Sequence, residues 1–393
     1  MTTVLQAPTS AMDIWSDEIL ADPHDAFTEL REQGAAVYLE SSDVWAITRY
    51  DEIRSALADW ETFTSTRVAF NPQMNEVLIG TSLASDPPLH TQMRAALTEN
   101  LTPRALRGLK GTIEEKADRI VAELVTRDAF DGVHDLAREL PLQIVLDLIG
   151  VQGDVREKIL DWGASAFNLL GPMNERSQQS FPLAGELFEW THGMDGNQLA
   201  EGSIGRAVFD AGARGDIPPE LCGHIIHQYL AAGMDTTIGA IANAVRAFGE
   251  NPDQFTLVKA DPSLIPAAFN ETLRHQALLH AVGRGTTRDV TIDGVTIPGG
   301  SQVAILLYAG NRDPRHYDDP DTFRVERNPI DHLSFGYGVH GCAGQGLARL
   351  EAYAAIGAFC RHVESFSVGT AVPKLNNSSR ALASLPVFDV VVA

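Results

Sequence analysis

The segment that decides the fold is Phe335-Gly-Tyr-Gly-Val-His-Gly-Cys-Ala-Gly344. Its four glycines, at positions 336, 338, 341 and 344, let the backbone around Cys342 turn tightly and approach a flat partner closely. A helix expected to begin near Ala343 directs its positive N-terminal end toward the sulfur. Free turn amides and the helix end both favour the ionised thiol, which is the form that binds metals.

The same segment contains the spacing G-x-G-x-x-G, which is also typical of dinucleotide-binding loops. Such a loop needs a preceding strand, a following helix and an acidic residue about 20 positions later. The 393-residue chain ends 52 residues after Gly341, and that remainder shows no alternation of parallel strands. A zinc site is disfavoured because no second cysteine or histidine pair has a suitable spacing. One cysteine on a glycine loop instead indicates haem, which brings its own equatorial ligands.

The pattern Phe335-x-x-Gly-x-His340-x-Cys342-x-Gly344 resembles the haem-ligand signature of the cytochrome P450 monooxygenases. Other motifs of that family occur in the expected order over nearly the whole chain. The resemblance implies one cytochrome P450 domain over residues 1–393, mainly α-helical with small β-sheets. It implies haem b (iron protoporphyrin IX) as cofactor, with Cys342 as the iron ligand and Phe335 and Gly344 in the cofactor-binding loop.

Two further motifs acquire roles from this resemblance. Ala232-Gly-Met-Asp-Thr236 lies in a long apolar helix, where Asp235 and Thr236 are expected to relay protons to oxygen. The alternative from the residues alone is a hydroxyl bonded back to its own helix. Glu271-x-x-Arg274 places an acid and a base on one helix face. It resembles the family's structural pair, which Arg327 completes, although Arg324 stands where Asp is common.

The two propionates of haem need cations or strong hydrogen-bond donors when they are buried. Four residues stand at the positions where the family supplies them: His90, Arg94, Arg284 and His340.

The expected substrate pocket is mostly apolar and suits a small hydrophobic or aromatic compound. Its candidate lining residues are Ser65, Arg67, Val68, Phe70, Phe167, Leu170, Met234, Leu279, Val282 and Leu382. Ser65 and Arg67 are candidate anchors for an anionic end. His280 lies near this pocket in sequence, and either alters the substrate or is an ordinary surface histidine. His224 and His227 are i, i+3 neighbours without a third metal-binding motif.

Three short stretches, 166–172, 375–380 and 384–386, are similar to bacterial members that oxidise para-substituted benzoic acids. We therefore expect an enzyme that uses O2 and two electrons to hydroxylate or oxidatively O-demethylate a benzoate-like substrate. A terpenoid or another small apolar substrate is the alternative. Less favoured functions are a peroxide-driven haem–thiolate oxidase and a non-catalytic haem protein that senses gas or carries electrons.

Electrons have to come from a partner, because the chain has no flavin or iron–sulfur segment. The resemblance implies a ferredoxin with its reductase, and Arg104, Arg107, Lys110 and Arg349 form a candidate basic docking cluster.

The net charge of −22 argues against nucleic-acid binding. No signal peptide or membrane span is apparent, and three cysteines do not suggest a disulfide framework. We expect a cytoplasmic monomer.

Apolar periodicity predicts helices over residues 113–149, 219–248 and 343–359. An Asp293-Gly294 turn predicts a hairpin of residues 290–292 and 295–297, with residues 302–307 as a partner strand. Another small sheet is expected at residues 37–48, and a C-terminal strand at residues 384–392.

Overall fold

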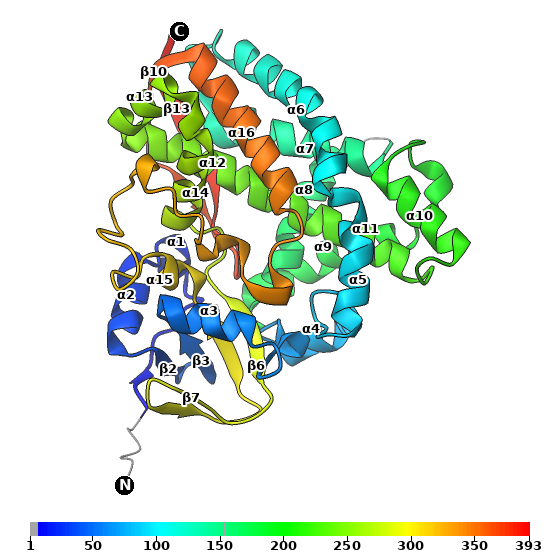
Figure 1. Cartoon of the computed structure of the whole chain (residues 1–393), viewed down its shortest axis with the longest axis vertical. Helices are drawn as coiled ribbons and strands as arrows, with labels where there is room; N and C mark the ends of the chain where they lie inside the picture. The colour runs from blue at the N-terminus through cyan, green and yellow to red at the C-terminus, as the bar shows by residue number, and fades with distance from the viewer. Residues whose placement is uncertain (1–6, 153–154) are drawn as a thin grey trace.

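The computed structural model describes residues 7–152 and 155–393 and is mainly helical with small sheets (Figure 1). The helices are α1 (Asp17–Ala21), α2 (His24–Gln33), α3 (Tyr50–Ala58), α4 (Pro72–Val77), α5 (Leu89–Thr98), α6 (Pro103–Leu124), α7 (Glu139–Ile149), α8 (Arg156–Asn168), α9 (Glu175–His192), α10 (Ile204–Arg214), α11 (Leu221–Gly233), α12 (Asp235–Glu250), α13 (Pro252–Ala260), α14 (Ile265–His275), α15 (Leu307–Asn311) and α16 (Gln345–His362). None of the helices in these ranges combines the length and apolar character needed to cross a bilayer.

The largest sheet has six strands in the order β1-β2-β3-β9-β6-β4 and lies at the lower end of the molecule in Figure 1. Its strands are β1 (Thr9–Ser10), β2 (Ala36–Leu39), β3 (Val44–Ile47), β4 (Phe63–Thr64), β6 (Val282–Thr286) and β9 (Gln302–Ile305). The smaller sheets comprise β5 (Ala129–Asp131), β7 (Val290–Ile292), β8 (Val295–Ile297), β10 (Val363–Val368), β11 (Val372–Lys374), β12 (Ala381–Ser384) and β13 (Pro386–Val392).

The predicted hairpin is confirmed as β7 and β8, which pair antiparallel around Asp293 and Gly294. Both turn residues have positive φ, 47° and 80°, which is the backbone of the turn that an Asp-Gly pair favours. The predicted partner strand forms as β9 but does not join the hairpin. It pairs parallel to β3 and antiparallel to β6, so the hairpin stands apart as a two-stranded ribbon.

The helix predicted over residues 113–149 is wrong as one element, because it consists of α6 and α7 with β5 between them. β5 adds to the edge of β13. The Asp131 carboxylate accepts hydrogen bonds from the amides of Val133 and His134 and from the Ser384 hydroxyl. These bonds make Asp131 the N-cap of the π-helical turn Gly132–Ala137, so a new helical segment begins there after β5.

The helix predicted over residues 219–248 is also divided, into α11 and α12, at Met234. The Thr236 hydroxyl donates to the Ala232 carbonyl (2.7 Å) and the Thr237 hydroxyl to the Gly233 carbonyl (3.1 Å). Side-chain donors therefore satisfy carbonyl groups of the preceding turn where the helix is interrupted. The interruption lies beside the main cavity of the molecule, which both Gly233 and Thr236 line.

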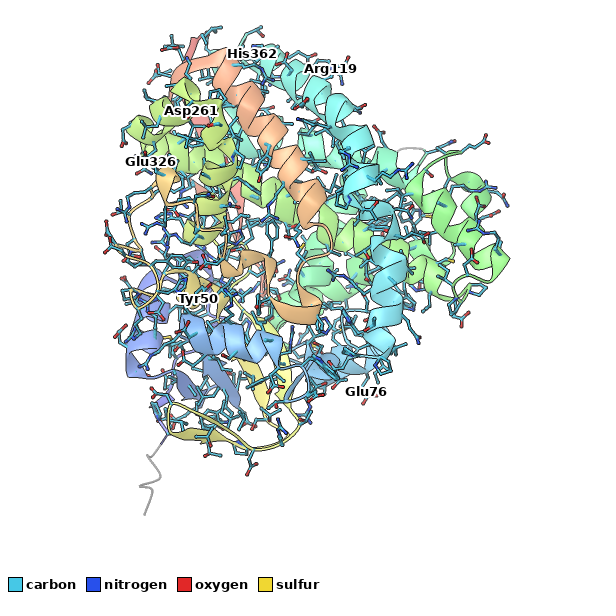
Figure 2. All side chains as sticks on the ribbon, in the orientation of Figure 1. Tyr50, Glu76, Arg119, Asp261, Glu326 and His362 are labelled. Atoms are coloured by element: carbon cyan, nitrogen blue, oxygen red, sulfur yellow. The ribbon has the colours of Figure 1, made fainter. Side chains whose placement is uncertain are left out.

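Helix α16 directly follows the cysteine loop and packs along α6 on one side (Figure 1). Asp118 of α6 holds the far end of α16, through Arg361 (2.9 Å) and His362 (3.0 Å). Figure 2 shows Arg119 and His362 at this same end of the molecule. The α6–α16 pair therefore provides a firm support for the loop that carries Cys342.

A buried ion-pair network joins α14 to the loop that leads into the cysteine segment. Glu271 and Arg274 are fully buried and form two hydrogen bonds of 2.8 Å. Arg327 donates to the same carboxylate at 3.2 Å, and so does the backbone amide of Arg324, at 3.0 Å. Arg324 thus joins the network through its backbone.

We expect Glu271→Ala to lower the free energy of unfolding by about 3–5 kcal/mol, because it leaves Arg274 buried without its counter-charge. The measurement is urea-induced unfolding of the purified protein, followed by tryptophan fluorescence.

The matched control is Glu250→Ala, which removes the partially exposed Arg246–Glu250 pair of α12. Exposed i, i+4 pairs contribute only about 0.3–0.5 kcal/mol. Equal losses in the two variants would contradict a structural role for the buried network.

Candidate active site

The main cavity has a volume of about 690 Å³ and is bounded by helices α5, α8, α9, α11, α12 and α16 and by the cysteine loop. Its wall is predominantly apolar. Cys342 lines it, together with Phe335, Gly336, His340 and Gly344 of the same loop. The sequence segment that decides the fold is therefore also one wall of this cavity.

The cysteine loop is held in shape by its own backbone. The Cys342 amide donates to the Phe335 carbonyl (2.7 Å), and the Gly341 amide donates to the Gly338 carbonyl (3.1 Å). Gly336 and Gly338 have positive φ, 68° and 71°, where a side chain is strained. A Cβ on Gly338 would also lie 2.5 Å from the Leu57 carbonyl oxygen of α3, so this position requires glycine.

The Cys342 thiol experiences opposing influences. Burial raises its pKa, whereas hydrogen bonds from the Gly344 and Gln345 amides and the charges of Arg94 and Arg349 lower it. The two amides belong to the N-terminus of α16, as the sequence predicts. A metal ion deprotonates a thiol that coordinates it. In the metal-bound state the amide donors would therefore stabilise the Cys342 thiolate.

The four residues expected to hold propionates are gathered on one side of the cavity. Arg94, Arg284 and His340 line it, and the His90 ring lies 4.1 Å from the His340 ring. Arg94 also donates to the Gly341 carbonyl, which ties α5 to the cysteine loop. Burial lowers the pKa of Arg284 to about 10 and that of His340 to about 3.

These residues fit a haem. Both ring nitrogens of His90 and Nε2 of His340 are buried and have no hydrogen-bond partner among the described residues. Buried polar atoms are nearly always paired, so such atoms indicate an additional group that accepts hydrogen bonds. Two carboxylates beside a cysteine thiol and two arginines would satisfy them.

The predicted substrate-pocket residues fall into two groups. Those that line the cavity are Val68, Phe70, Phe167, Leu170, Leu279 and Val282. Those outside its described lining are Ser65, Arg67, Met234 and Leu382.

Each residue of the second group has another environment. Arg67 is exposed and donates to the Gly300 carbonyl, while the stem of its side chain lies against Gly285. Ser65 is buried, and its amide donates to Asp86 (3.0 Å). Met234 packs in the hydrophobic core, and Leu382 lines a separate crevice. The two candidate anchors for an anionic end therefore do not reach the cavity.

The acid and the alcohol of the proton-relay motif lie on different sides of α12. Thr236 lines the cavity, whereas Asp235 is buried outside its lining. The Asp235 carboxylate accepts hydrogen bonds from Lys374 of β11 (3.2 Å) and from Ser379 (3.4 Å). Lys374 is about one-third exposed, so the acid connects the helix to the solvent side of β11.

His280 is only 3% exposed, which rules out an ordinary surface histidine. Its backbone amide donates to the Ser378 carbonyl (3.2 Å), and its ring lies outside the cavity lining. Burial lowers its pKa well below the usual value, so the ring is neutral at neutral pH.

An opening is marked by large apolar side chains that line the cavity and are also exposed. They are Val77 (57%), Leu83 (40%), Phe181 (36%) and Phe188 (41%). They come from α4, the segment before α5, and α9. Exposed apolar clusters of this kind are typical of sites where apolar ligands or partners bind.

Glu351 is a buried acid that sequence analysis missed. It lies on α16, is 1% exposed, and has no hydrogen-bond partner for either carboxyl oxygen among the described residues. Burial raises its pKa to about 8. In the sequence it is an ordinary helical glutamate nine residues after Cys342, and only the packing of α16 reveals its burial.

Comparison with known proteins places this geometry in one family. Residues 261–386 match the family model described as Cytochrome P450. Cytochrome p450 CYP199A2 of Rhodopseudomonas palustris is 35% identical over 390 residues, which cover 97% of this chain and 94% of that protein. Cytochrome P450 monooxygenase PikC of Streptomyces venezuelae is 30% identical, over 98% of this chain and 95% of its own length.

Solved structures agree with these relatives. Cytochrome P450 CREJ in complex with (4-ethylphenyl) dihydrogen phosphate superimposes with a TM-score of 0.82 and 28% identity. The match covers 94% of this chain and 97% of that chain.

Glu351→Gln tests the buried acid through the pH dependence of stability. The carboxyl keeps its proton up to about pH 8 in the folded protein but loses it near pH 4.3 when unfolded. Between these values the folded state binds more protons, so the parent loses stability as pH rises. We expect the glutamine variant to gain up to about 5 kcal/mol relative to the parent between pH 4.5 and 8.

Urea unfolding of both proteins at a series of pH values measures this difference. A stability difference that stays constant over the whole range would show that Glu351 is ionised or compensated in the folded state.

Proposed function

The chain belongs to the cytochrome P450 family, and from that premise we propose that it hydroxylates or oxidatively O-demethylates a small hydrophobic, aromatic, benzoate-like substrate. The observation that carries this proposal is a single cysteine at the wall of a largely apolar cavity, beside buried donors that have no partner among the described residues. Thiolate, propionate partners and substrate space then share one cavity.

The residues that would hold haem b are Cys342, as iron ligand, and the group His90, Arg94, Arg284 and His340, as partners of the propionates. Phe335 and Gly344 would flank the cofactor in the loop. When bound, haem activates molecular oxygen and transfers one oxygen atom to a C–H bond of the substrate. The Cys342 thiolate would donate electron density to the bound cofactor.

Thr236 and Asp235 divide the delivery of protons between them. Thr236 presents its hydroxyl at the cavity wall while its own proton is engaged with the Ala232 carbonyl, which leaves oxygen lone pairs to accept a proton. Asp235 accepts a hydrogen bond from Lys374. Its carboxylate can therefore exchange protons between the solvent side of β11 and the cavity wall. The overall reaction consumes two protons and two electrons, and yields a hydroxylated product and water.

The apolar lining favours an aromatic or otherwise hydrophobic substrate. The aromatic choice is supported by the sequence similarity to members that oxidise para-substituted benzoic acids. It is also supported by CREJ, which was solved with a para-substituted phenyl compound. If the oxidised carbon is a methoxy methyl, the hemiacetal product collapses to a phenol and formaldehyde. A terpenoid of similar size is the second candidate for the same cavity.

We propose that the electron donor is a ferredoxin with its reductase, docking near α6 and the start of α16. Arg104, Arg107 and Lys110 are exposed on α6, which packs along α16. Arg349 lies on α16 itself, with its guanidinium 4.5 Å from the Phe335 ring. This basic cluster stands out in a chain of net charge −22 and suits an acidic partner.

The proposed function predicts a reduced, carbon-monoxide-bound protein with the red-shifted absorption typical of thiolate coordination. Cys342→Ser should abolish that absorption, because a hydroxyl is not an equivalent ligand. Cys360→Ser is the matched control, since this thiol is buried within α16 and lies outside the cavity lining. A parent protein without the red-shifted band, or a Cys342→Ser variant that keeps it, would refute the haem–thiolate assignment.

Charge reversal at Arg107 tests the proposed docking surface. We expect Arg107→Glu to slow ferredoxin-driven turnover at least fivefold at low salt, and the loss should shrink as salt screens the charges. Turnover driven by hydrogen peroxide should stay unchanged, because it needs no docked partner.

Lys158→Glu makes the same charge change on α8 and serves as control. Equal losses in the two variants would indicate a general charge effect instead of docking. Peroxide-driven turnover that exceeds the ferredoxin-driven rate in the parent would favour the peroxide-driven oxidase.

A further inference from the structure

The charges on the cavity wall are distributed unevenly. Among the described lining residues, Arg94 and Arg284 are the two with a permanent positive charge. Both lie with His340 on the cysteine side, where they are committed to the proposed propionates. Arg67, the arginine expected to anchor an anionic end, is engaged with Gly300 outside the cavity.

A second polar region lies on α9 and α11, and we call it the α11 wall. It consists of Glu189, His224, His227 and Gln228, which all line the cavity. Positions 224, 227 and 228 share one face of α11, as their spacing requires. This face leads toward Thr236, which lies eight to nine residues later in the chain, beyond the interruption at Met234.

Apart from Glu189, the α11 wall offers hydrogen-bonding groups that carry no permanent charge. His227 Nδ1 is buried and has no partner among the described residues, and burial lowers the pKa of this ring to about 4. Burial also lowers the pKa of His224. Gln228 accepts a hydrogen bond from the Ser82 hydroxyl at 2.6 Å, and no described residue accepts from its amide nitrogen. No group of metal ligands is placed to hold an ion within the described ranges.

An aryl carboxylate would therefore meet no cation at this end of the cavity. It would lie near Glu189, an acid, and two uncharged histidines. A carboxylate removed from water without a counter-charge is strongly disfavoured, whereas a neutral carbonyl or hydroxyl needs only a hydrogen bond. A site that hydrogen-bonds one polar group discriminates strongly against compounds that cannot match it.

We propose that the substrate is an uncharged aromatic compound whose hydrogen-bonding group, a carbonyl or hydroxyl, binds His227 and Gln228 while its other end faces Thr236. This inference rests on the proposed function and specifies the charge of the substrate. The substrate would be a neutral compound with the shape of a benzoate, and not the benzoate anion itself. His227 and Gln228 are then the residues that select the substrate.

Three ligands of similar shape, one charged and two neutral, test the inference. We would titrate haem-loaded protein with 4-methoxybenzoate, 4-methoxybenzamide and 4-methoxyacetophenone, and measure dissociation constants from the shift of the ferric haem absorption. The expected result is at least tenfold tighter binding of the two neutral compounds. Tighter binding of the carboxylate would overturn the proposal.

Variants of the α11 wall locate the effect. His227→Leu and Gln228→Leu should each weaken binding of the neutral compounds several-fold, because a hydrogen-bonding group is lost. Gln228→Arg should shift the preference toward the carboxylate by adding the missing cation. Gln179→Leu, at an exposed position of α9 outside the cavity lining, is the matched control and should change nothing.

The outcomes separate this inference from the function on which it rests. If no compound shifts the spectrum while the carbon-monoxide band remains red-shifted, the substrate class is wrong and the haem–thiolate function stands. If Gln228→Arg leaves the preference unchanged, the α11 wall does not recognise the polar group.

Discussion

The structure depends on the neutralisation of one buried carboxylate. Glu271 is fully buried, and such a charge is tolerated only when it is paired and its oxygens accept hydrogen bonds. Arg274 and Arg327 supply the charges, and both also donate to carbonyls of the loop over residues 311–322. The loop must therefore pack against α14. It continues into the cysteine segment, which Ser334 fastens to the Leu273 carbonyl of the same helix.

Features that depend on local sequence could be predicted, and features that depend on packing could not. The glycine loop, the Glu271–Arg274 pair and the Asp293-Gly294 hairpin each rest on residues a few positions apart. The helix expected over residues 113–149 is divided where β5 pairs with the distant strand β13. The helix expected over residues 219–248 is divided where it borders the cavity. The burial of Glu351 likewise arises from packing. Apolar periodicity continues through such divisions, so the sequence pattern alone does not reveal them.

The sequence also does not reveal which charged and polar side chains reach the cavity. Arg67 is near Val68 in sequence, and Val68 lines the cavity. The arginine side chain nevertheless runs along Gly285, where a side chain on that residue would collide with it, and ends at Gly300. Conversely, Gln228 gives no sequence signal, and the spacing of His224 and His227 does not indicate a cavity wall, because polar residues on a helix usually face solvent. Only the packing of α9 against α11 turns this face inward.

The proton-relay role proposed for Asp235 and Thr236 depends on helix geometry. Consecutive residues on a helix point about 100° apart, and here Thr236 faces the cavity while Asp235 does not. The structure uses that separation: the alcohol lines the wall, and the acid reaches Lys374 and Ser379 on the other side. Ser378, the neighbour of Ser379, itself lines the cavity. Adjacent residues of the C-terminal segment therefore contact the cavity and the Asp235 carboxylate.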